Sequence, residues 1–89
     1  MKQYSVDYDP HVIKKLNKLD TSVRNRIITW IDEHLVSCEN PRLLGKALHG
    51  DRHGHWRYRV GDYRIIAKIE DDKIIIFVVK IDKRGEIYD

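Results

Sequence analysis

Three strand patterns follow one another between residues 55 and 81, and this succession constrains the fold more than any other feature. In 55–60, large apolar residues alternate with arginines, as in a strand with one buried face. Gly61-Asp62 is a two-residue hairpin signal before a second run at 63–70, and Asp71-Asp72 precedes a third run at 73–81. The third run is apolar on both faces, which is typical of a strand covered on both sides.

Two amphipathic helices are expected before these strands. Residues 3–8 alternate in polarity like a short strand, and Asp9-Pro10 then supplies an N-cap and a proline at the first helical position. Apolar residues recur at helical spacing after Pro10 and again over 22–37, and the short connection predicts an antiparallel helical hairpin. The fold class is therefore α+β. We expect a small antiparallel meander sheet packed against an N-terminal helical hairpin, with the first strand beside the last.

The length of 89 residues suits a single domain, residues 1–89. Cys38 is the only cysteine, so an internal disulfide is impossible, whereas small secreted domains usually depend on such bridges. The first residues lack the apolar run of a signal peptide, and the longest apolar run, 74–79, is too short to span a bilayer. We expect a cytoplasmic protein with no membrane partner.

Positive charge is concentrated in and after residues 43–54, a glycine-containing segment that we expect to form a loop. The basic residues and histidines between 46 and 64 are Lys46, His49, Arg52, His53, His55, Arg57, Arg59 and Arg64, against Asp51 and Asp62. Strand alternation puts Arg57 and Arg59 on one face, and the hairpin brings Arg64 close if the register agrees. Such arginines repel one another unless an anion lies between them. The cluster is either a phosphate-binding concavity or a solvated basic face whose arginines pair with helix carboxylates.

Other reactive residue types give weaker indications. The spacing of His49, His53 and His55 matches no common zinc pattern, so neither a metal nor another cofactor is expected. Trp30 and Trp56 are interpreted as core or half-core residues rather than base-stacking platforms.

Several blocks of the chain resemble the RelE branch of the RelE/ParE toxin superfamily. They are the opening strand and helix pair, Lys-Ala-Leu-His-Gly at 46–50, the stretch 56–66, the apolar run 74–79, Lys83-Arg84 and Tyr88. The aromatic-Arg-x-Arg run followed by Gly-Asp-Tyr-Arg is the most specific of these. The resemblance covers essentially the whole chain and implies a toxin of a type II toxin-antitoxin system.

The resemblance further implies a metal-independent, ribosome-dependent mRNA endonuclease. In such an enzyme the 2′-hydroxyl of the A-site codon attacks the adjacent phosphate and expels the 5′-oxygen. The matching positions imply that Arg64 clamps the scissile phosphate. Arg84 would stabilise the leaving oxygen or help to donate its proton, and Tyr88 would stack on a base or orient the sugar. With these, Arg57 and Arg59 complete the expected basic cluster. Residues expected to bind RNA are Lys46, His49, Arg52 and Lys83.

The chain departs from well-known members of the family, which carry lysines at the positions of Arg57 and Arg59. An arginine does not readily lose its proton, so it is a poor general base. His55 is adjacent, lies on the same strand face, and titrates in the useful range, which makes it a candidate base. Alternatively, catalysis rests on electrostatics alone and the histidines contact ribosomal RNA.

Two other functions remain open on the residues: a ParE-like toxin that inhibits gyrase without nuclease activity, and a nucleic-acid-binding module without catalysis. A toxin that cleaves its own cell's mRNA requires neutralisation. The implied partner is a RelB-like antitoxin that folds on binding, covers the basic face or displaces the tail, and carries the complex to operator DNA.

Overall fold

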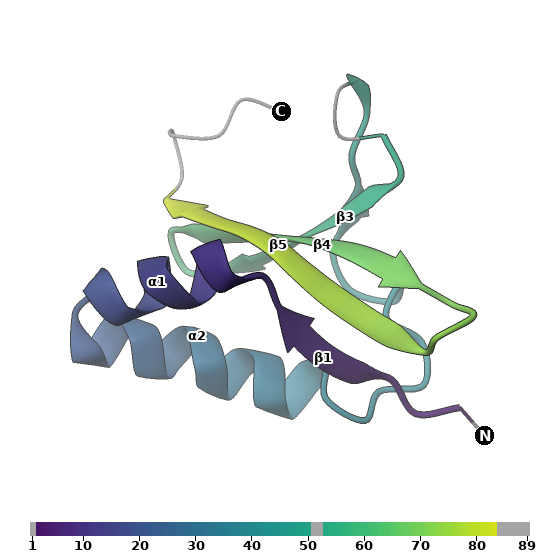
Figure 1. Cartoon of the computed structure of the whole chain (residues 1–89), viewed down its shortest axis with the longest axis horizontal. Coiled ribbons are helices and arrows are strands. Elements are labelled where there is room, and N and C mark those ends of the chain that lie inside the picture. Colours follow the sequence, from purple (N-terminus) through teal and green to yellow (C-terminus); the bar gives the residue numbers. More distant parts are fainter. Residues whose placement is uncertain (1, 51–52, 84–89) are drawn as a thin grey trace.

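Five strands form one sheet, and two helices pack against one of its faces (Figure 1). The computed structural model describes residues 2–50 and 53–83. Along the chain the elements are β1 (Ser5–Tyr8), α1 (Pro10–Lys18), α2 (Thr21–His34), β2 (Lys46–Ala47), β3 (His55–Val60), β4 (Tyr63–Glu70) and β5 (Ile75–Lys83). The predicted α+β architecture, with the helical pair between the first strand and the meander, is confirmed.

The strand order is β1-β5-β4-β3-β2. The consecutive strands β3, β4 and β5 form the predicted antiparallel meander. As predicted, β1 lies beside β5, but it runs parallel to it, with Ser5 opposite Ile75 and Tyr8 opposite Val78. The sheet is therefore mixed. A parallel pair needs a long crossover, which the helices and the meander provide here.

The segment expected to be a loop contains a short strand. Lys46 and Ala47 of β2 pair with Arg57 and Trp56 of β3. Gly45 makes this approach possible, because its φ is 79° and a Cβ there would lie 2.2 Å from the carbonyl oxygen of Arg57. Two residues are too few for a visible alternation of polarity, so the sequence did not reveal this strand.

The ends of several elements also differ from the expectation. The second helix stops at His34 rather than at residue 37, where Ser37 takes a positive φ of 64°. The last strand begins at Ile75 rather than at residue 73, since the preceding turn extends through Ile74, whose φ is 56°. The predicted N-cap of the first helix is present: the Asp9 carboxylate accepts a hydrogen bond from the backbone N–H of His11 at 2.9 Å.

The core lies between the helices and the inner face of the sheet. Its largest fully buried side chains include Ile27 and Ile31 from α2, Leu35 directly after α2, and Tyr58, Ile65, Ile76, Val78 and Ile81 from the sheet. The apolar stripes predicted for the helices are therefore the faces that are buried. No helix in the described part of the chain is both long and apolar enough to cross a bilayer.

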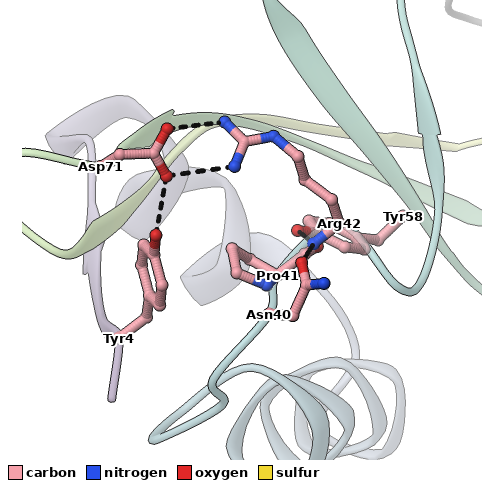
Figure 2. Close-up of polar contacts among 6 residues, drawn as sticks. All are labelled: Tyr4, Asn40, Pro41, Arg42, Tyr58 and Asp71. Carbon is pink, nitrogen blue, oxygen red and sulfur yellow. Dashed lines mark hydrogen bonds and ion pairs between the residues drawn. The ribbon is translucent and has the colours of Figure 1, made fainter. Parts of the chain in front are cut away.

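A polar clamp, consisting of Tyr4, Arg42 and Asp71, ties three distant segments together (Figure 2). The Asp71 carboxylate in the β4–β5 turn accepts hydrogen bonds from the Tyr4 hydroxyl at 2.7 Å and from both terminal nitrogens of Arg42 at 3.1 and 3.0 Å. Hydrogen bonds from Arg42 and then from Tyr4 lower the pKa of Asp71. Nearby, the buried Tyr58 hydroxyl donates to the carbonyl oxygen of Pro41 at 2.5 Å. These contacts fix the start of the chain and the loop after α2 to the sheet.

Candidate functional site

Four cations occupy neighbouring positions on the sheet face that the helices leave open. We call this set, Lys46, Arg57, Arg59 and Arg64, the cation face. The β3–β4 register sets Arg59 directly opposite Arg64, and the β2–β3 register sets Lys46 opposite Arg57. Alternation along β3 then turns these side chains away from the buried Tyr58 and Val60. The register therefore agrees with the expectation that the hairpin brings Arg64 close to Arg57 and Arg59.

The backbone beneath the cation face is anchored on both sides. Ile66 of β4 lies on the same face as Arg57, which is its partner on β3, and it is fully buried. Its other neighbour is Lys80 of β5. On the inner face, Tyr58 and Ile65 are fully buried as well. A guanidinium that leaves such a strand starts from a fixed Cα, so the cluster is preorganised before an anion arrives.

Asp82 is the one charged side chain that is buried within residues 2–50 and 53–83. It lies opposite Arg64 on β5 and pairs with Lys15 of α1 and, at 3.2 Å, with Lys80. Burial alone would raise the pKa of this carboxyl, but hydrogen bonds from the two lysines and their charges outweigh burial and lower it. The carboxylate is thus kept ionised by lysines from both sides. The sequence analysis did not single out Asp82, although the alternation of side chains along β5 could have placed it on the sheet face that carries Arg64.

The histidines differ in their surroundings. His55 is half-buried at the start of β3, opposite Lys68, and strand alternation puts it on the side of Arg57. Its Nδ1 atom is buried and has no hydrogen-bond partner within the part of the chain that the structure describes. His49 and His53 are exposed in the loop between β2 and β3. Among the described residues no three His, Cys, Asp or Glu side chains are grouped closely enough to hold a metal ion.

The structure brings some of the expected site residues together and separates one. Lys46, Arg57, Arg59, Arg64 and His55 share one face of the sheet. Lys83, expected to bind RNA, lies opposite Tyr63, and strand alternation therefore assigns it to the opposite face of the sheet. Three further expected residues, Arg52, Arg84 and Tyr88, lie outside the described residues.

Comparison with known proteins identifies relatives over nearly the whole chain. The family described as "ParE toxin of type II toxin-antitoxin system, parDE" matches residues 6–88. The mRNA interferase toxin RelE of Escherichia coli K12 is 30% identical over 88 residues, which cover 96% of this chain and 90% of that protein.

Solved structures agree with this relationship. A chain of the toxin-antitoxin complex RelBE2 from Mycobacterium tuberculosis superposes with a TM-score of 0.81 at 22% identity, over 97% of each chain, which supports the fold. A chain of the intact E. coli RelBE complex superposes with a TM-score of 0.73 at 26% identity, over 94% of this chain and 99% of that one. The chain therefore belongs to the RelE/ParE superfamily of type II toxin-antitoxin toxins, as a RelE-like member.

Proposed function

We propose that this toxin is a ribosome-dependent mRNA endonuclease that cuts the codon in the ribosomal A site. The observation that carries the proposal is the cation face, above all the direct opposition of Arg59 and Arg64. Two guanidinium groups fixed side by side offer several N–H donors to one anion with several oxygens, so the pair is suited to hold a phosphate. Similarity to a relative named an mRNA interferase supports RNA as the source of that anion.

The proposed chemistry is an in-line transesterification. The ribose 2′-oxygen loses its proton and bonds to the adjacent phosphorus, the bond from phosphorus to the 5′-oxygen breaks, and the leaving oxygen takes up a proton. The products are a 2′,3′-cyclic phosphate and a 5′-hydroxyl. Charge that builds on the phosphoryl oxygens is stabilised by permanent cations without a metal, and removal of one such preorganised donor costs about 10²–10³ in rate. We assign the phosphate clamp to Arg64, with Arg57 and Arg59 beside it.

The proton acceptor cannot be one of these arginines, because a guanidinium stays protonated. We assign this role to His55, which lies on the cation side of β3. A histidine ring nitrogen within hydrogen-bond reach of the 2′-hydroxyl is able to accept its proton. We assign stabilisation of the leaving oxygen to Arg84 and contact with a base or sugar to Tyr88. Lys46, His49, Arg52 and Lys83 are proposed to hold the flanking RNA.

The partner is proposed to be a RelB-like antitoxin. Structures similar to this chain include RelB–RelE complexes from E. coli and from two archaea. A segment that folds over the cation face would block RNA and neutralise the mutual repulsion of the arginines in one step. Operator DNA would then be bound through the antitoxin.

The decisive experiment measures single-turnover cleavage of mRNA on programmed ribosomes. Arg64→Ala should slow cleavage by about 10²–10³, whereas Lys73→Ala, which removes a cation from the far β4–β5 turn, should leave the rate unchanged. His55→Ala should slow cleavage by about 10²–10⁴, the usual contribution of a general base. Cleavage by Arg64→Ala at the wild-type rate would refute the site assignment.

The matching family is described by its ParE members, so gyrase inhibition is the second candidate. A supercoiling assay separates the two functions. Inhibition of gyrase by the pure toxin, with intact mRNA on the ribosome, would replace the nuclease proposal.

A further inference from the structure

We propose that a groove at the open edge of β3 is a second RNA subsite, which takes a nucleotide flanking the scissile phosphate. The inference rests on the proposed function in one respect, since it takes single-stranded RNA as the ligand. It gives Trp30, which the sequence indicated to be a core or half-core residue, an additional role on a surface that contacts RNA. We call this site the edge groove.

The edge groove consists of two adjoining cavities of about 530 and 300 Å³. Trp30 and Arg59 line both of them, so the cavities are neighbours. The wall formed by α2 carries the polar side chains of Ser22, Asn25, Arg26, Thr29 and Glu33. The opposite wall is the end of β3 with its turn at Gly61, and the segment from Leu44 to Lys46 closes the far end. Cavities of several hundred cubic ångströms are of the size that holds small organic ligands.

The groove contains two arginines, Arg26 and Arg59, for which no ion pair is seen within the described part of the chain. Within the described ranges, neither Arg26 nor Arg59 has a carboxylate within ion-pair distance, although Glu33 lies on the same wall. Arg26 packs against the β3–β4 turn, where its guanidinium would be 2.9 Å from a Cβ at residue 61. The absence of a side chain at Gly61, whose φ is 59°, leaves room for that contact. The turn therefore holds Arg26 toward the end of the strand that carries Arg59, and a phosphate would relieve the repulsion.

The aromatic component is held rigidly. The half-buried Trp30 ring stacks on His34 with ring centroids 4.6 Å apart, and it packs against the buried Tyr58 at 5.8 Å. Trp56, in contrast, is engaged by a 2.6 Å hydrogen bond from its indole nitrogen to the carbonyl oxygen of Leu44. A fixed indole beside cations is the usual composition of sites for single-stranded nucleic acid, since every base offers a flat face or edge to it.

The edge groove adjoins the cation face. Arg59 belongs to both, and Arg57 and Lys46 line the smaller cavity. RNA bound at Arg64 can therefore continue past Arg59 into the groove. An acidic protein segment would also meet the cations, but it would not use a fixed indole with polar helix side chains in the same way, and the observations favour RNA.

The test is direct binding of 2′-O-methyl RNA, which cannot be cut, to the free toxin. Two fluorescent oligonucleotides are compared, one of about three and one of about eight nucleotides, lengths chosen to cover the cation face alone or both sites. Trp30→Ala and Arg26→Ala should each weaken binding of the longer RNA about 10-fold and leave the shorter RNA almost unaffected. Lys73→Ala is the matched control. Because Arg26 is exposed, its variant tests the groove even if loss of Trp30 disturbs folding.

Each outcome has a defined meaning. Wild-type affinity of Arg26→Ala for the longer RNA would overturn the inference, as would weaker antitoxin binding with unchanged RNA binding. Trp30-dependent RNA binding without cleavage on ribosomes would reject the proposed nuclease while supporting the groove. Ribosomal cleavage that depends on Arg64, with no difference in binding between the two oligonucleotides, would support the nuclease and reject the groove.

Discussion

Replacing Arg59 by glutamine should make the free toxin more stable at low salt. Arg59 faces Arg64 across the β3–β4 pair and shares the edge groove with Arg26. Directly opposed side chains begin about 5 Å apart. Two unit charges roughly 6–7 Å apart in water repel by about 0.6–0.7 kcal/mol. Two such neighbours give a gain of roughly 1 kcal/mol at low ionic strength, less whatever the other interactions of Arg64 already offset.

Urea denaturation at about 10 mM and 1 M salt measures this gain, since the Debye length falls from about 30 to 3 Å between the two. Thermal unfolding is a second measurement of the same change. At low salt its midpoint should rise by roughly 4–8 °C for each kcal/mol of added stability, and this rise should vanish at high salt. The same variant should bind RNA more weakly, and the slope of log affinity against log salt should fall by about 0.7 for the lost phosphate contact.

Lys73→Gln serves as a control, because it removes the same charge but should change the stability in the opposite direction. Lys73 lies 3.7 Å from the Glu70 carboxylate, so its removal should cost a small amount of stability at low salt. Destabilisation of the Arg59 variant by the same amount at both salt concentrations would refute the reasoning. It would mean that the Arg59 side chain stabilises the fold by packing, and that its charge does not destabilise the free toxin.

Three further predictions concern the frame around the site. Asp82→Asn should lower the free energy of unfolding by about 1.5–3 kcal/mol at neutral pH. Because folding lowers the pKa of Asp82, its contribution to stability is present above about pH 4 and is lost as the pH falls through the folded pKa. The stability of the variant should therefore fall less steeply at acid pH than that of the wild type. Gly45→Ala should destabilise by at least about 2 kcal/mol, since its Cβ would meet the β3 backbone, whereas Gly50→Ala, with nothing within 4 Å, should cost less in a urea titration. Tyr58→Phe should lose about 1–3 kcal/mol in the same titration, because it leaves the Pro41 carbonyl oxygen without its buried donor.

Local patterns in the sequence were sufficient for most of the fold. Asp9-Pro10, the helical stripes and the alternation in 55–60 each specify a backbone state over a few residues, and the structure has all three. The pairing of Arg59 with Arg64 followed from the two-residue turn between them, which fixes the register of a hairpin.

Features that depend on distant segments were not predictable from such patterns. The parallel direction of β1, the pairing of β2 and the burial of Asp82 are set by packing between elements far apart in the chain. Trp30 is half-buried against the core, as the sequence predicted, but only the end of β2 shows that β3 leaves an open edge beside it.

The parallel pairing of β1 with β5 also sets an order of events during synthesis. β1 is made well before its hydrogen-bonding partner, residues 75–78. At about 5–20 residues per second, β1 waits several seconds for that partner. The β3–β4 hairpin can form earlier, but the sheet is not closed, and Asp82 and Lys80 are not in place, until β5 has emerged. A nascent chain stalled before β5 would expose an unfinished core to chaperones and proteases, and would carry only part of the charged surface of the finished toxin.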